Sequence, residues 1–259
     1  MLKKAFTLAE VLITLGIIGV VAAITIPNTV AKYQKTVTQI KLKKTVNTMS
    51  SSFKKILADE EAESLLNTSL FYNNGTRISK DTLSKYLKFK INTKQWQLYS
   101  WGVFNERDKY PVSSRWGGIW GASNASKFFI ILPDTGVHVK VEAYVRTLTP
   151  RQIERVKSLG GSMYSQCGTL VFDINGEKGP NISAKDTFEF NFDCNGNIYP
   201  TAGLHEAAFM DASNSASFNQ RYWRVAGLCG IPGKKLTSSV AGFGCSGRLG
   251  ENDYLIDYY

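Results

Sequence analysis

The sequence predicts an α+β protein in which a long N-terminal helix packs on an antiparallel β-sheet. Three observations lead to this class: an apolar run over 6–26, a helical spacing of apolar residues that continues to about 58, and segments of strand-like composition in the middle of the chain. The part 59–259 is long enough to bury its own core. We therefore expect one globular head behind the helix.

The apolar run is long enough to cross a bilayer. Its 21 residues, at about 1.5 Å each, match the roughly 30 Å of bilayer hydrocarbon. An ordinary signal peptide has a shorter apolar core, and a core helix of a soluble protein is apolar along one stripe only. Glu10 is the one charged residue in the run. A carboxylate at this depth usually marks a functional contact, so Glu10 is predicted to meet a cationic partner.

The start of the chain resembles the N-terminus of type IV prepilins and of type II secretion pseudopilins. Those proteins carry a short basic leader, a cleavage site before Phe or Met, a Glu at the fifth mature position and often a Pro at the twenty-second. Counted from Phe6, Glu10 is fifth and Pro27 is twenty-second. Ala5 stands where the family usually has Gly. The resemblance covers about the first fifth of the chain.

This resemblance implies a pilin-like, non-enzymatic subunit of a type IV pilus or a type II secretion pseudopilus. A prepilin peptidase would remove the leader 1–5 by cutting between Ala5 and Phe6, and the new α-amine of Phe6 would be methylated. The apolar helix would then pack against homologous pilin or pseudopilin subunits on an inner-membrane assembly platform, with Glu10 paired to the amine of a neighbour. Such a buried pair sets register more than stability.

The basic leader also predicts an orientation. Lys3 and Lys4 precede the span and would hold the N-terminus in the cytoplasm. We therefore expect a single-pass protein of the inner (cytoplasmic) membrane with its head outside, which later enters the pilus or pseudopilus. A rival from another class is a membrane-anchored binding protein (adhesin) or hydrolase whose span is only a tether.

Beyond Pro27 the helical pattern becomes amphipathic, which predicts one helix over 6–58 that is bent or loosened at the proline. Two separate helices meeting at Pro27 are the alternative. The apolar positions recur at three- and four-residue spacing: Val30, Tyr33, Val37, Ile40, Leu42, Val46, Met49, Phe53 and Ile56.

Lysines lie between these apolar positions. They form either a solvated face or a polybasic patch for acidic headgroups or nucleic acid. The net charge is +10, and without Lys3 and Lys4 it is +8, from 29 basic and 21 acidic side chains. That charge is compatible with binding nucleic acid but does not decide the question.

Several short elements are predicted in the head. Two runs joined by a Pro-Asp-Thr-Gly turn predict a β-hairpin, and other segments alternate as strands or begin like helices. The predicted ranges are a helix at 80–87, strands at 95–104, 128–132 and 137–145, a helix at 150–159, and strands at 169–174 and 187–192. Four tryptophans within 96–120 form either part of the core or an exposed platform for a sugar or a partner.

All four cysteines lie in the C-terminal part of the chain that we expect outside the cell. An even number in an oxidising compartment predicts two disulfides, with three possible pairings. We favour Cys167 with Cys194 and Cys229 with Cys245, because each pair brackets a compact segment. A zinc site is the alternative, but no C-x-x-C motif is present.

The loop that begins at Asp173 is a candidate calcium site. Asp173, Asn175 and Glu177 place oxygen atoms at alternate positions beside a glycine, and Asp186 follows. Calcium prefers such oxygen ligands, although the spacing is not that of an EF-hand. The alternative is a structural turn held by hydrogen bonds from its Asx side chains.

Overall fold

The computed structural model describes residues 7–91, 127–176, 187–201 and 203–213. The chain divides into two units, one up to Ile40 and one from Lys41, and the first helix contributes to both. In chain order the elements are α1 (Leu8–Asp59), the 3-10 turn η1 (Leu65–Asn67), β1 (Phe71–Tyr72), β2 (Arg77–Ile78), α2 (Lys80–Tyr86), β3 (Lys90–Ile91), β4 (Lys127–Leu132), β5 (Val137–Thr147), α3 (Pro150–Ser158), β6 (Ser165–Asp173), β7 (Thr187–Phe192), β8 (Ile198–Pro200) and α4 (Leu204–Ser213).

Helix α1 continues without interruption through Pro27. The side-chain amide of Asn28, next to the proline, donates to the carbonyl of Ile24 over 3.3 Å. The threonines of the apolar stretch also turn their hydroxyls inward: Thr14 and Thr25 each donate to the carbonyl four residues earlier at 2.9 Å. Polar side chains are satisfied in this way without any partner outside the helix.

In the described part of the chain the main sheet has six strands in the order β3-β4-β5-β6-β7-β8, and every neighbouring pair is antiparallel. The predicted hairpin is confirmed, because β4 pairs with β5 from Leu132 opposite Val137 down to Lys127 opposite Glu142. Gly136 closes the turn with a φ of 68°, and its N–H donates to the carbonyl of Leu132 over 2.8 Å. The α+β class is therefore correct.

The other predicted elements of the head are also found where the structure describes them. α2 begins after Ser79, whose hydroxyl accepts from the N–H of Thr82. α3 begins with a capping box, in which Thr149 and Gln152 each accept a backbone N–H of the other. Strands β6 and β7 match two of the predicted runs, while the predicted strand at 95–104 lies outside the described residues.

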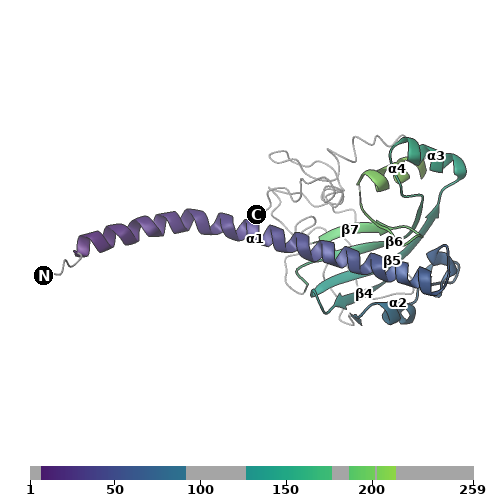
Figure 1. The fold of residues 1–259 in the computed structure, drawn as a ribbon, viewed down its shortest axis with the longest axis horizontal. Helices are drawn as coiled ribbons and strands as arrows, with labels where there is room; N and C mark the ends of the chain where they lie inside the picture. The colour runs from purple at the N-terminus through teal and green to yellow at the C-terminus, as the bar shows by residue number, and fades with distance from the viewer. Residues whose placement is uncertain (1–6, 92–126, 177–186, 202, 214–259) are drawn as a thin grey trace. The chain divides into compact units, whose positions relative to one another are not determined.

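The core lies between the sheet and the part of α1 from Lys41, which crosses one face of the sheet (Figure 1). Phe53 of α1 stacks on Phe192 of β7 with 4.7 Å between ring centroids, and Phe71 approaches the same ring at 6.4 Å. Four large side chains of α1 are buried here, and they meet inward-facing residues of the four longest strands: Leu42, Met49, Phe53 and Ile56 from the helix, with Phe128, Ile130, Val139, Val141, Leu170, Phe172, Phe188 and Phe190 from the sheet.

The apolar stripe predicted from Val30 onward is wrong in its first part. Val30, Tyr33 and Ile40 are exposed, and burial of the large apolar side chains begins at Leu42. Helical spacing identifies residues that share a face, but it does not say where along the helix that face becomes covered. Thr45, which is fully buried, donates its hydroxyl to the carbonyl of Lys41 over 2.8 Å and so lies in the interface without an unsatisfied group.

The second face of the sheet is polar and nevertheless buried. Lys140 of β5 is 2% exposed and pairs with Glu142 on the same strand. Asn191 of β7 accepts from the side-chain amide of Gln166 over 2.7 Å and donates to the hydroxyl of Thr201 over 3.3 Å. Because buried polar groups are costly unless bonded, this network fixes the register of the strands that carry it.

Candidate functional site

The first candidate site is the start of α1, where Glu10 lies. Glu10 Oε2 accepts from the backbone N–H of Thr7 over 2.8 Å and from its hydroxyl over 2.9 Å. In return, the N–H of Glu10 donates to the Thr7 hydroxyl over 3.3 Å. These reciprocal bonds are a capping box, which satisfies backbone donors that the first turn of a helix otherwise leaves free.

The capping box was missed in the sequence, although Thr7 and Glu10 have the T-x-x-E spacing that signals it. Its geometry matters for the predicted partner of Glu10. Both bonds from Thr7 go to Oε2, and among the described residues no hydrogen bond reaches Oε1. The carboxylate can therefore cap its own helix and still accept from a cation. Ala5 and Phe6, the predicted processing residues, lie outside the described part of the chain.

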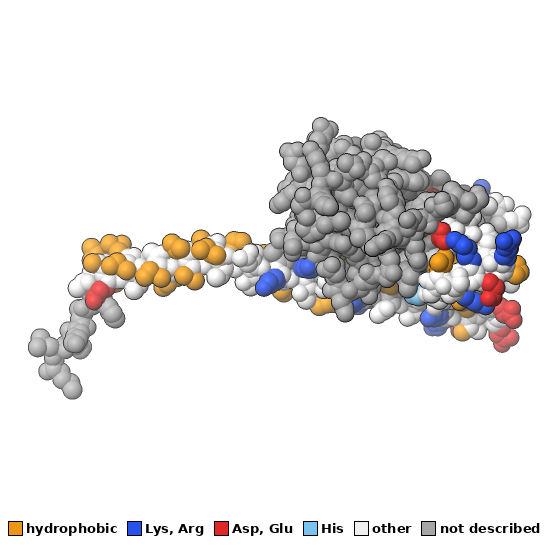
Figure 2. All heavy atoms as spheres, turned by 90° about the horizontal axis from the view of Figure 1, so that it is seen from above, with side chains coloured by type: hydrophobic (Ala, Val, Ile, Leu, Met, Phe, Trp, Pro, Cys, Tyr) orange, Lys and Arg blue, Asp and Glu red, His pale blue; other side chains and the backbone are white. Residues whose placement is uncertain are grey.

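The stretch from Leu8 to Ile26 exposes its large apolar side chains, and Figure 2 shows them along one face of the helix. The exposed large residues are Leu8, Val11, Leu12, Ile13, Leu15, Ile17, Ile18, Val20, Val21, Ile24 and Ile26. Gly16 and Gly19 add two positions with open space around them. An apolar surface of this extent is not stable in water, so it must be covered by lipid or by other helices. The helix is long and apolar enough to span a membrane.

A second constellation is built around the disulfide between Cys167 of β6 and Cys194, which lies just after β7. Their Cα atoms are 5.0 Å apart, and 27 residues separate them in the sequence. This is the pairing that the spacing favoured, whereas Cys229 and Cys245 lie outside the described residues. The carbonyl of Cys194 accepts from the N–H of Leu65 over 2.8 Å, and this backbone bond joins η1 to the same turn.

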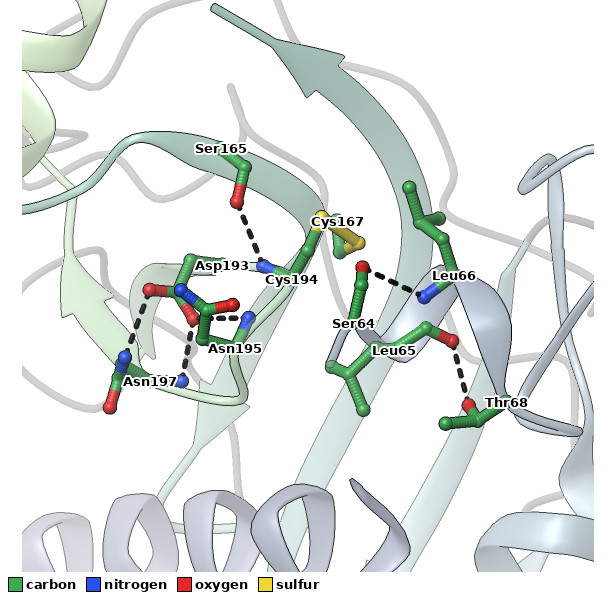
Figure 3. Close-up of a disulfide and its surroundings, with 10 residues drawn as sticks. All are labelled: Ser64, Leu65, Leu66, Thr68, Ser165, Cys167, Asp193, Cys194, Asn195 and Asn197. Atoms are coloured by element: carbon green, nitrogen blue, oxygen red, sulfur yellow. Dashed lines mark hydrogen bonds between the residues drawn. A yellow bond between two sulfur atoms is a disulfide. The ribbon is translucent and has the colours of Figure 1, made fainter. Parts of the chain in front are cut away.

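The turn after β7 is organised by Asp193, which is 2% exposed (Figure 3). Its Oδ1 accepts from the N–H groups of Asn195 and Asn197 over 3.0 and 2.7 Å, and its Oδ2 accepts from the Asn197 amide over 3.0 Å. Gly196, with a φ of 80°, brings the backbone close to α1, and its carbonyl accepts from the hydroxyl of Ser50 over 2.9 Å. A side chain at Gly196 would crowd Phe53.

The turn after β6 repeats the D-x-N-G pattern. The carboxylate of Asp173 is buried and accepts from the N–H of Gly176, three residues on, over 3.1 Å, so this side chain helps to hold the turn. No group of three His, Cys, Asp or Glu side chains in the described residues could hold a metal ion. Glu177 and Asp186, two of the four predicted calcium ligands, lie outside those residues. A calcium site at Asp173 and Asn175 therefore stays a prediction.

One serine and one histidine that are distant in the sequence lie together near α4. The hydroxyl of Ser162 and Nδ1 of His205 are 3.1 Å apart. The nearby carboxylate of Asp193 accepts from the phenol of Tyr199 over 3.1 Å and from its own turn, rather than from His205. A Ser-His-Asp triad needs the acid on the histidine, so these residues do not form one.

Tyr199 gives the head a measurable response to alkali. Burial, and then the negative charge of Asp193, raise the pKa of Tyr199 to about 12 from its ordinary 10.0. A raised pKa means that the folded state holds the phenol proton more tightly than the unfolded state does. The stability from this group is therefore complete below pH 10 and declines as the pH rises from 10 towards 12.

We accordingly expect Tyr199→Phe to remove part of the alkaline loss of stability. Urea unfolding at pH 9 and pH 11 should show a larger drop in midpoint for the wild type than for the variant. Lysines also titrate in this range, but both proteins contain the same lysines, so their effect on the midpoint cancels in the comparison. Equal drops in the two proteins would show that Tyr199 ionises as freely in the folded state as in the unfolded state.

Comparison of the chain with models of known protein families, with curated proteins and with solved structures gives no significant match. A function therefore has to follow from the residues and the geometry described above.

Proposed function

We propose that the protein is a prepilin-like structural subunit of a type IV pilus or a type II secretion pseudopilus. In this proposal the chain is cut after Ala5, anchored by the first half of α1 and assembled through that same helix. The observation that carries it is the position of Glu10. It is the only charged residue in a stretch whose large apolar side chains are exposed, and within the described residues one of its carboxylate oxygens accepts no hydrogen bond.

Cleavage would create that partner. The new α-amine of Phe6 would lie four residues before the Glu10 of its own chain, and the same amine on a neighbouring subunit could reach Glu10 once the helices pack side by side. In an apolar environment a cation and a carboxylate attract strongly, and each is costly to leave alone. The pair would therefore favour one stagger between neighbouring helices. Gly16 and Gly19 allow the close helix approach that packing in lipid requires.

The disulfide supports an extracytoplasmic head, because such bridges form and persist in oxidising compartments. The lysines alone do not decide the orientation. Two precede the span, whereas five follow it within 18 residues of Ile26: Lys32, Lys35, Lys41, Lys43 and Lys44. The usual bias of basic residues would by itself favour the opposite orientation. The disulfide between Cys167 and Cys194, and not the distribution of charge, supports export of the head.

Mass spectrometry of the native protein tests the proposal directly. We expect a mature chain that begins at Phe6 and carries a methyl group on its amine. Incomplete cleavage would leave some uncut precursor beside the chain that begins at Phe6, and such a mixture also fits the proposal. A protein that keeps Met1 throughout, or one cut near Ala23 as by a signal peptidase, would overturn the assembly proposal and favour a simple anchor or a secreted protein.

A further inference from the structure

A short polar segment follows the membrane-spanning stretch of α1. We call Lys32, Tyr33 and Lys35 the interfacial segment. Lys32 is exposed, Tyr33 is 70% exposed and Lys35 is partly exposed, all on a continuous helix. The proposed subunit function assigns these residues no role, and the core of the head does not include them.

Their distance from the end of the span places the helix backbone at these lysines just outside the polar layer of a bilayer. Lys32 and Lys35 come six and nine residues after Ile26, which is about 9 and 14 Å along a helix. The headgroup region adds about 5 to 7 Å on each side of the hydrocarbon. Lysine side chains have long apolar stems that can lean back towards the membrane and leave the ammonium among the headgroups. Both cations can therefore reach this layer.

Along α1 the charge of this segment has no acidic counterpart. Between Glu10 and Asp59 the sequence contains seven lysines and no acidic residue. Within the described part of the chain, neither Lys32 nor Lys35 makes an ion pair. Phospholipid phosphates and anionic headgroups would supply the missing negative charge, at about 1 kcal/mol for each lysine near an anionic surface.

The direction of Tyr33 favours a bilayer over a flat polyanion as the partner of this segment. Lys32 and Lys35 are three residues apart and share one side of the helix, whereas Tyr33 points about 100° away from Lys32. A flat partner such as duplex DNA would meet the two lysines and leave the ring in water. A bilayer surrounds the helix and meets all three side chains, and tyrosine is enriched at the membrane interface.

We propose that Lys32, Tyr33 and Lys35 bind anionic phospholipid headgroups in the leaflet from which the chain emerges after Ile26, and so fix the depth of α1 in the membrane. This inference rests on the membrane anchor of the proposed function and not on its assembly step. A subunit held at a fixed depth would present Glu10 at one level to every neighbour.

Native mass spectrometry of the full-length protein in detergent, titrated with dioleoylphosphatidylglycerol or dioleoylphosphatidylcholine, tests the proposal. We expect the anionic lipid to bind more tightly than the zwitterionic one. Lys32→Gln/Lys35→Gln should weaken the Kd for phosphatidylglycerol about 30-fold and leave phosphatidylcholine unchanged. The matched control is Lys54→Gln/Lys55→Gln, which removes two exposed lysines further along the same helix and should change the Kd less than twofold.

A second variant tests the aromatic contribution separately. Tyr33→Ala should weaken both lipids to a similar degree, because the ring contributes without charge. Circular dichroism of each variant should match the wild type, as expected for substitutions on exposed positions of a helix. The proposal would be overturned if binding of the two lipids were lost only in variants whose helix content is reduced.

Three other results would also overturn it. The first is equal affinity of the wild type for the two lipids. The second is an equal loss of affinity for phosphatidylglycerol in the two double-lysine variants. The third is an unchanged lipid Kd in Lys32→Gln/Lys35→Gln together with lost binding to a 20-base-pair duplex DNA. The same spectra report the N-terminal mass. An intact Met1 with selective lipid binding would therefore refute the subunit proposal and leave the interfacial segment supported.

Discussion

Replacing Glu10 with Ala is expected to reduce incorporation into filaments on the order of a hundredfold while membrane insertion stays intact. Breaking a buried ion pair from one side costs about 3 to 5 kcal/mol, because the remaining charge is left buried without its partner. Here the remaining charge would be the α-amine of a neighbouring Phe6. Insertion should even be favoured slightly, since the variant removes a carboxylate from an apolar stretch. Immunoblots of sheared filaments and of the membrane fraction measure the two quantities.

Two further variants separate the charge of Glu10 from its capping bonds. Glu10→Gln keeps an oxygen that can accept from Thr7 but removes the charge, whereas Thr7→Ala keeps the charge and removes the capping hydroxyl. We expect Glu10→Gln to behave like Glu10→Ala. Thr7→Ala should lose only about fivefold, since an N-cap contributes about 1 kcal/mol. Normal filament yield in Glu10→Gln would show that Glu10 is a capping residue and nothing more.

Replacing Cys167 and Cys194 with Ser should lower the free energy of unfolding of the head by about 3 to 4 kcal/mol. The bridge spans 27 residues, and the loop that it closes restricts the unfolded chain by about this amount. The loss should be large relative to the total, because domains of this size are stable by only about 5 to 15 kcal/mol. Urea unfolding of the full-length protein in detergent, followed by near-UV circular dichroism, measures it.

Ser165→Ala is the matched control for the disulfide. It keeps the bridge and removes only the hydrogen bond that the N–H of Cys194 donates to the Ser165 hydroxyl over 3.2 Å. The expected loss is about 1 kcal/mol. A loss below 1 kcal/mol in the double cysteine variant would mean that the hydrogen bonds of the Asp193 turn hold this region without the bridge.

The elements of the head were predictable where local signals are strong. The Pro-Asp-Thr-Gly turn defines the hairpin of β4 and β5, and Thr149-Pro150 marks the start of α3. The capping box at Thr7 could also have been recognised from its spacing. The same glutamate thus carries two local signals, the T-x-x-E spacing and a charge in an apolar stretch.

What the sequence could not predict depends on contacts between distant segments. Alternation along β5 marks Lys140 as polar and therefore as exposed, yet the fold buries it beside Glu142. Similarly, Tyr33 and Phe53 both occupy apolar positions of one helix, and nothing in the local sequence distinguishes them. Yet Tyr33 is exposed, whereas Phe53 is buried and stacks on Phe192 of the sheet. The approach of Ser162 to His205 likewise depends on how α4 is placed.

The order of the strands in the sheet has a consequence for how the head could form. Among the strands that the structure describes, from β3 to β8, each lies beside its predecessor in the chain, and the helix that covers them comes first. In the proposed subunit the head would emerge from the membrane from its N-terminal side, so each new strand could pair with one already in place. The pairings within this sheet join successive strands, which favours rapid folding. The bridge between Cys167 and Cys194 can close as soon as β7 has paired with β6, before α4 has emerged.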